Sequence, residues 1–138
     1  MFVLDTNVVS ELRKPARANA RVAQWAGNIS LDQLYLSALT VLEIELGVLR
    51  MERKDKRQGA ELRMWLEGQV LADFSGRILP LEVTIARRCA GLHVPDPMPE
   101  RDAMIAATAL VHGMTLVTRN VNDFQRAKVK LFNPWLHD

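Results

Sequence analysis

The sequence predicts an α/β fold of three layers (αβα), in which helices cover both faces of a mostly parallel sheet of about five strands. Apolar runs of three or four residues, typical of buried strands, alternate with longer segments whose apolar residues recur every three or four positions, as in helices. Strands that alternate with helices are joined by crossovers, and crossovers give parallel pairing. The 138 residues, 49% of them hydrophobic, suffice for one domain over residues 1–138.

The first strand is expected at residues 2–4, because this apolar run stops at Asp5, as a buried strand does at a polar turn. Helical patterns follow in two segments, one closing near Pro15 and one ending at Gly27. A second strand is expected at 34–36.

Thr40 is expected to open the next helix. Gly47 lies inside this pattern, where a glycine costs about 1 kcal/mol relative to alanine, and we expect it to mark a close approach of another helix or subunit. The most basic stretch of the chain, Arg50 to Arg57, leads into a long amphipathic helix that continues to Val70.

The second half of the chain repeats the alternation of strands and helices. Pro80 confines the third strand to residues 78–81, and a helix is expected over 84–92. After a proline-rich connector, Pro99 is expected as the first residue of a helix that stops at Gly113. The fourth and fifth strands are expected at 114–117 and 129–132.

Composition excludes several classes of protein. Aliphatic content is high and the net charge is only +2, from 18 Lys+Arg and 16 Asp+Glu, so a disordered chain is excluded, and no apolar run approaches the ~20 residues that span a membrane. The N-terminus lacks the basic segment of a signal peptide. The single cysteine, Cys89, and three scattered histidines cannot build a zinc site, and a lone cysteine fits the reducing cytoplasm.

Four acidic residues are expected at one edge of the sheet. Asp5 follows the first strand, Glu43 lies early in the helix after the second, Asp102 is in the first turn of the later helix, and Asp123 follows the fourth strand. Ligands of open parallel sheets bind beyond the carboxyl ends of the strands. The four carboxylates therefore converge where a binding crevice is expected.

Each acid also has a purely structural explanation. The segments Thr40 to Glu43 and Asn120 to Asp123 have the form of capping boxes, Asp102 suits the positive end of its helix, and Asp5 suits an N-cap. The convergence of all four acids nevertheless favours a functional site. Several of the acids stand beside apolar residues, where an acid with only a structural role in solvent is not expected. Two carboxylates about 4 Å apart repel by roughly 4 kcal/mol at an effective dielectric near 20, so a hard divalent cation such as Mg2+ or Mn2+ is expected.

A set of short motifs is spread in order along the whole chain: Val3-Leu4-Asp5-Thr6-Asn7, Tyr35-Leu36-Ser37-Ala38-Leu39-Thr40-Val41-Leu42-Glu43, Gly76-Arg77-Ile78-Leu79-Pro80, Asp102 with Ile105-Ala106-Ala107-Thr108-Ala109, Thr118-Arg119-Asn120 with Asp123-Phe124, and Phe132-Asn133-Pro134-Trp135. This ordered set resembles the motifs of the PIN-domain family, and within it those of the VapC- and FitB-like toxins of type II toxin–antitoxin pairs.

The resemblance implies a PIN-like sandwich and a Mg2+- or Mn2+-dependent endoribonuclease that hydrolyses phosphodiesters of RNA through a metal-activated water. Asp5, Glu43 and Asp102 match the three principal acids of the family, and Asp123 matches its more variable fourth position; all four are assigned to catalysis and metal binding.

The resemblance also implies supporting residues and partners. Asn7, Thr118 and Asn120 are the supporting candidates. A homodimer is implied, held inactive by a small VapB- or FitA-like antitoxin through which alone the complex binds DNA, and no membrane is involved.

Basic residues near the first acid are candidates for contact with RNA phosphates. They are Arg13, Lys14 and Arg17, with Arg119 after the fourth strand; a solvated helix face is the alternative explanation. The tryptophans are expected in packing roles. If the four acids share one pocket with a metal, the remaining chain carries 18 basic against 12 acidic groups, or +6, which suits an RNA partner better than +2 does.

Two other functions are compatible with the sequence. The first is a binding module that silences or localises a partner in a toxin–antitoxin-like complex without cutting RNA. The second is phosphoryl transfer with Asp5 as nucleophile, as in haloacid-dehalogenase-like phosphatases. These require D-x-D-x-T after the first strand, whereas Asp5 is followed by Thr6-Asn7-Val8-Val9, so this alternative ranks last.

Overall fold

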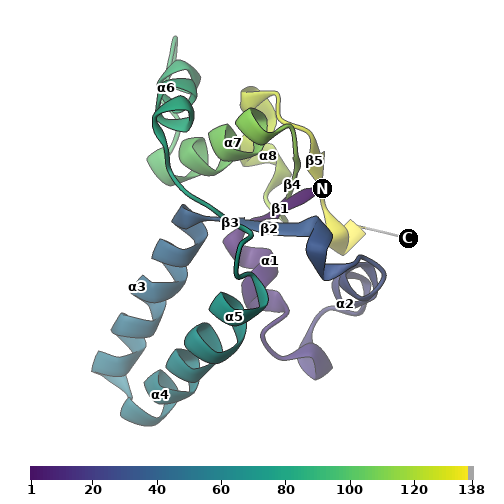
Figure 1. Cartoon of the computed structure of the whole chain (residues 1–138), viewed down its shortest axis with the longest axis vertical. Coiled ribbons are helices and arrows are strands. Elements are labelled where there is room, and N and C mark those ends of the chain that lie inside the picture. The colour runs from purple at the N-terminus through teal and green to yellow at the C-terminus, as the bar shows by residue number, and fades with distance from the viewer. Residues whose placement is uncertain (137–138) are drawn as a thin grey trace.

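The computed structural model describes residues 1–136, and it confirms the predicted fold class (Figure 1). Five parallel strands form one sheet in the order β3-β2-β1-β4-β5. The strands are β1 (Phe2–Leu4), β2 (Leu34–Ser37), β3 (Ile78–Leu79), β4 (Thr115–Val117) and β5 (Leu131–Phe132). The helices are α1 (Thr6–Glu11), α2 (Ala20–Gly27), α3 (Ala38–Lys54), α4 (Lys56–Trp65), α5 (Leu71–Asp73), α6 (Val83–Leu92), α7 (Glu100–His112) and α8 (Val121–Phe124).

The side chains of the central strands point alternately to the two faces of the sheet, and an apolar cluster lies on each face. In β1, Val3 packs with α6, α7 and α8, whereas Leu4 packs with α1, α2, α3 and the α4–α5 segment. Leu116 and Val117 of β4 divide in the same way. Successive side chains of a strand point to opposite faces, so three residues of β1 supply both cores and fix the αβα layers.

The register of β1 and β4 positions the residues that follow them. Leu4 pairs with Val117, and the amide of Asp5 donates to the carbonyl of Val117 at 2.9 Å. Asp5 and Thr118 therefore lie side by side at the carboxyl edge of the sheet.

Helices α3 and α4 form an antiparallel hairpin that projects from the sheet (Figure 1). Asp55 separates them and caps α4, since its carboxylate accepts from the amides of Arg57 and Gln58. The basic stretch thus turns the chain between two helices. Beyond Trp65 the predicted long helix continues through a π-helical turn at Leu66–Val70 into α5.

Some predicted boundaries are wrong. Helix α3 begins at Ala38, and its cap is Ser37, whose hydroxyl accepts from two amides of the first turn, so Thr40 does not open it. Strand β3 has two residues rather than four, because Pro80 has no N–H to donate. Pro99 is the N-cap of α7, not its first helical residue.

The connector before α7 contains a cis peptide bond between Val94 and Pro95, and Arg126 donates to the carbonyls of Leu92 and Asp96. Gly113 ends α7 with a φ of 64°, a left-handed conformation that favours glycine, which confirms the predicted stop. Among the described residues, no helix has the length and apolar character needed to cross a membrane.

Candidate active site

Asp5 is the buried centre of the carboxyl edge, with only 6% of its surface exposed. Its Oδ2 accepts from the hydroxyl of Thr118 at 2.8 Å and from Nδ2 of Asn7 at 3.3 Å, and its Oδ1 accepts from the amide of Thr6 at 2.8 Å. The last bond also makes Asp5 the N-cap of α1, so the structural role expected for it is present. Three donors fix the orientation of this carboxylate.

Burial raises the pKa of Asp5 above its ordinary value. The hydrogen bonds from Thr118 and Thr6 act in the opposite direction because they favour the ionised form, and the negative charge of Glu43 raises the pKa further. Desolvation outweighs the donors. A positive charge close to Asp5 would therefore favour the ionised form of its carboxyl group.

Glu43 reaches the edge from the second turn of α3. Its Oε1 accepts from the hydroxyl of Thr6 at 2.6 Å, and that hydroxyl lies 3.3 Å from the hydroxyl of Thr40. The predicted capping box of Thr40 and Glu43 is wrong, because Ser37 caps the helix and leaves both side chains free to face α1. On the other side, Nη1 of Arg101 lies 3.8 Å from Glu43 Oε2.

Asp102 lies in the first turn of α7. Burial raises its pKa, and the negative charges of Asp5, Asp123 and Glu43 raise it further, in that order. Asp123, exposed on α8, therefore belongs to the same field. The structure brings Asp102 within electrostatic reach of the other three predicted acids.

Polar groups connect the carboxyl ends of β1 and β4. Asn7 donates through Nδ2 to Asp5, its Nδ2 lies 3.4 Å from the Thr118 hydroxyl, and its Oδ1 accepts from the amide of Arg119 at 3.3 Å. The amide of Asn120 donates to the Thr118 hydroxyl at 3.0 Å. Asn120 makes no side-chain cap of α8, so the capping box predicted there is wrong. The three predicted supporting residues all adjoin Asp5 or its partner.

The donor set suits a hard divalent cation by its chemistry. It consists of carboxylate oxygens, and two of the acids have raised pKa values because burial and like charges oppose ionisation. Within residues 1–136, however, no group of three or more Asp, Glu, His or Cys side chains is arranged as a metal site. Asp102 therefore interacts electrostatically with the other three acids, but the described side chains are not arranged as a complete set of metal ligands.

Among the predicted RNA-contacting residues, Arg119 adjoins the acidic edge, because its amide donates to Oδ1 of Asn7. Arg13 and Lys14 line a depression beside α4, and the Arg13 guanidinium carbon lies 6.0 Å from the centroid of the Trp65 ring. Arg17 is exposed in a short turn. Arg119 lies over the ring of Trp135 at 5.3 Å. Within the described chain, the ion pair to the acids comes instead from Arg101.

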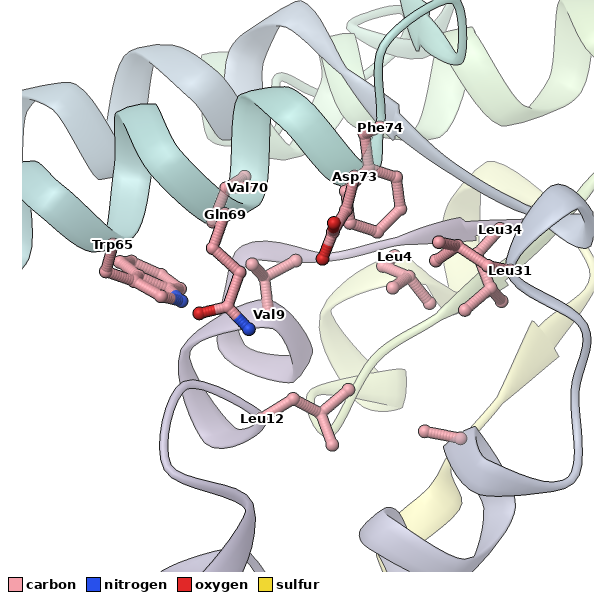
Figure 2. A pocket seen from close by; sticks show the side chains of 11 residues that line it. Leu4, Val9, Leu12, Leu31, Leu34, Trp65, Gln69, Val70, Asp73 and Phe74 are labelled. Atoms are coloured by element: carbon pink, nitrogen blue, oxygen red, sulfur yellow. The ribbon is translucent and has the colours of Figure 1, made fainter.

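An apolar hollow of about 200 Å³ lies on the α1 and α5 side of the sheet, away from the four acids (Figure 2). Leu4, Leu12 and Phe74 are among its walls, with Gln69 and Asp73 as its polar side chains. Trp65 stands at one end of it (Figure 2). The hollow lacks the clustered acids of the carboxyl edge.

Sequence reasoning missed Thr6 and underrated Arg101. Thr6 donates to Glu43, which is 37 residues away along the chain. The only local indication that Thr6 belongs to the site is its position directly after Asp5. Arg101 was visible as the neighbour of Asp102, but its pairing with Glu43 depends on how α7 and α3 meet.

Comparisons with known proteins agree with this arrangement. The PIN-domain profile matches residues 2–130. The chain is 40% identical to Toxin FitB of Neisseria gonorrhoeae over all of both chains, and 38% identical to VapC ribonuclease Y4jK of Sinorhizobium fredii over 98% of each. Among solved structures, a chain of the FitAB complex bound to an IR36 DNA fragment is similar, with a TM-score of 0.90 and 37% identity, covering 100% of this chain and 98% of the other.

Proposed function

Because the chain belongs to the PIN-domain family, among the VapC- and FitB-like toxin ribonucleases of toxin–antitoxin pairs, we propose that it is an endoribonuclease that requires Mg2+ or Mn2+. The observation that carries the metal requirement is the shared field of four carboxylates, in which Asp5 and Asp102 have raised pKa values. Such a field opposes the approach of an RNA phosphate unless a cation offsets it.

Asp5, Glu43 and Asp102 are the proposed ligands, with Asp123 at the outer rim. The chemistry that such an ion supplies when bound is polarisation of a phosphoryl oxygen and activation of water for attack on phosphorus. Binding of the ion requires all of these acids to be ionised. Their mutual repulsion opposes ionisation in the absence of the ion, and the positive charge of the ion offsets that repulsion.

The surrounding side chains orient the ligands. Thr118 and Asn7 hold Oδ2 of Asp5, and Thr6 holds Oε1 of Glu43. Partners that orient ligating carboxylates typically change metal affinity or activity by 10–100-fold when they are removed. Thr6 therefore joins Asn7, Thr118 and Asn120 as a supporting residue.

The proposed partners follow from the relatives. A small VapB- or FitA-like antitoxin is the proposed inhibitor, and contact with DNA is proposed to occur through that antitoxin, as a structure of FitAB with DNA suggests. A homodimer is proposed for the toxin.

The test is cleavage of a single-stranded RNA by purified protein with Mg2+. Asp5→Asn should abolish cleavage, because the uncharged amide cannot contribute a ligand charge, while circular dichroism stays that of the wild type. Asp32→Asn is the matched control, since Asp32 is exposed in the turn that precedes β2, at the opposite end of the sheet.

Undiminished cleavage by Asp5→Asn would refute the assigned site. Cleavage that continues in EDTA would refute the metal requirement. A wild-type protein that binds its antitoxin and RNA but cuts no RNA would favour the binding-module alternative.

A further inference from the structure

A second hollow, of about 200 Å³, adjoins Glu43 in the angle between α1, α3 and α4. This volume is below the roughly 300–1,000 Å³ typical of sites for whole small molecules, so the hollow suits a single flat group rather than a larger ligand. We call it the α1–α3–α4 hollow, and its lining consists of Thr6, Ser10, Glu43, Ile44, Gly47, Val48, Leu62 and Trp65.

One end of the α1–α3–α4 hollow is polar and continuous with the acidic site. Thr6 and Glu43 line it, and they are already joined by their 2.6 Å hydrogen bond. The hydroxyl of Ser10 has no hydrogen-bond partner among residues 1–136. Ser10 can therefore donate to, or accept from, a group that enters beside Glu43.

The remaining walls are apolar and include one aromatic ring. Trp65 lines both this hollow and the hollow of Figure 2. It is half-buried and packs against the apolar cluster that contains Leu4, in line with the packing role expected for it. Gly47 forms part of the opposite wall, and a Cβ added there would meet nothing within 4 Å. Within residues 1–136, no other helix approaches Gly47 as closely as expected.

Positively charged side chains lie beyond the α1–α3–α4 hollow. Leu62 also lines the depression that contains Arg13 and Lys14, and Arg13 lies near the Trp65 ring. A ligand that extends from Glu43 past Trp65 therefore meets carboxylates, then apolar and aromatic walls, then a depression in which Arg13 and Lys14 outnumber one carboxylate, Glu61.

We propose that the α1–α3–α4 hollow binds one nucleobase of single-stranded RNA next to the phosphate that is cleaved. A base has flat apolar faces for the walls and a polar edge for Ser10, and the following phosphate reaches Arg13 and Lys14. An apolar peptide would fill the walls but would bring no anion to the depression, where two cations face the single carboxylate of Glu61. The inference rests on the proposed function and adds a base-selecting subsite to it.

The experiment is cleavage of a randomised single-stranded RNA pool, with sequencing of the cut ends and measurement of KM, in the absence of antitoxin. Gly47→Leu fills the hollow from α3, where an added Cβ meets nothing within 4 Å, and Ser10→Leu fills it from α1 should the first variant fold poorly. Gly91→Leu is the matched control, because Gly91 is an exposed helical glycine of α6 with nothing within 4 Å of an added Cβ.

Each filling variant should lose the base preference at one position beside the cut. KM should rise by about 5-fold to 150-fold, the range equivalent to the ~1–3 kcal/mol that stacking of one base contributes, whereas the rate at saturating RNA should change less. Gly91→Leu should keep the wild-type values.

A folded filling variant that keeps the wild-type cut pattern and KM overturns the subsite and leaves the ribonuclease assignment intact. Normal RNA cleavage combined with lost affinity for the antitoxin also overturns it, because the occupant is then a protein. A wild-type chain that cuts no RNA overturns the proposed function, and the subsite with it.

Discussion

The packing of α4 on α3 depends on a glycine, and its replacement gives a quantitative prediction. A Cβ built on Gly59 would lie 2.5 Å from Cα of Glu52 and 2.7 Å from its backbone nitrogen. Backbone atoms cannot move aside as a side chain can, so Gly59→Ala must push the two helices apart. Overpacking of this kind costs about 1–3 kcal/mol, whereas alanine in a helix gains roughly 0.5–1 kcal/mol over glycine.

The expected net effect of Gly59→Ala is a loss of about 1–2 kcal/mol in the free energy of unfolding. For a chain of this size that lowers Tm by roughly 4 °C per kcal/mol. Gly47→Ala is the matched variant, because its Cβ meets nothing within 4 Å, and it should stabilise the protein by about 0.5–1 kcal/mol.

Urea denaturation followed by circular dichroism measures both variants. If Gly59→Ala is as stable as Gly47→Ala, the tight contact between α3 and α4 does not exist in solution, and the reasoning is refuted. The same variant should also reduce RNA cleavage, since α3 carries Glu43.

Three further predictions concern the acidic site. Burial raises the pKa of Asp102 in the folded state, so the contribution of this group to stability is present at acidic pH and is lost as pH rises through the raised pKa. In urea denaturation, Asp102→Asn should therefore stabilise the metal-free protein more at pH 7 than at pH 5. An equal gain in stability at the two pH values would contradict this. Thr6→Val removes the donor to Glu43 and should lower RNA cleavage by roughly 10–100-fold with little change of fold by circular dichroism; full activity would exclude a supporting role. Arg101→Gln removes the cation facing Glu43, so calorimetry should find Mn2+ bound up to about fivefold more tightly at low salt, matching the ~0.2–1 kcal/mol of an exposed pair, and a weaker affinity would show that Arg101 supports the site.

The sequence was sufficient for the layers and for the positions of the acids. Residues 2–4 are apolar on both faces of the strand and are followed by the polar Asp5, so the burial of β1 and the position of its carboxyl end follow from local pattern. Asp5 and Thr118 then meet because neighbouring parallel strands end at the same edge.

Contacts between distant helices were not predictable from local pattern. Ser37 and Thr40 both have the chemistry of an N-cap, and only the pairing of β2 with its neighbours decides that the strand ends at Ser37. Arg63 bridges Glu45 and Glu52 across the α3–α4 hairpin, at 2.7 and 2.9 Å, although its sequence context is that of any exposed helical arginine. These contacts depend on the angle and register of packed helices.

The pairing of Asp5 with Thr118 has a consequence for synthesis of the protein. The two residues are separated by 113 positions, and Asp102 lies almost as far along the chain. Since a chain emerges from the ribosome at roughly 5–20 residues per second, the first acid waits several seconds for the partners that orient it. A nascent chain therefore cannot hold Asp5 in its observed orientation until Thr118 has been synthesised.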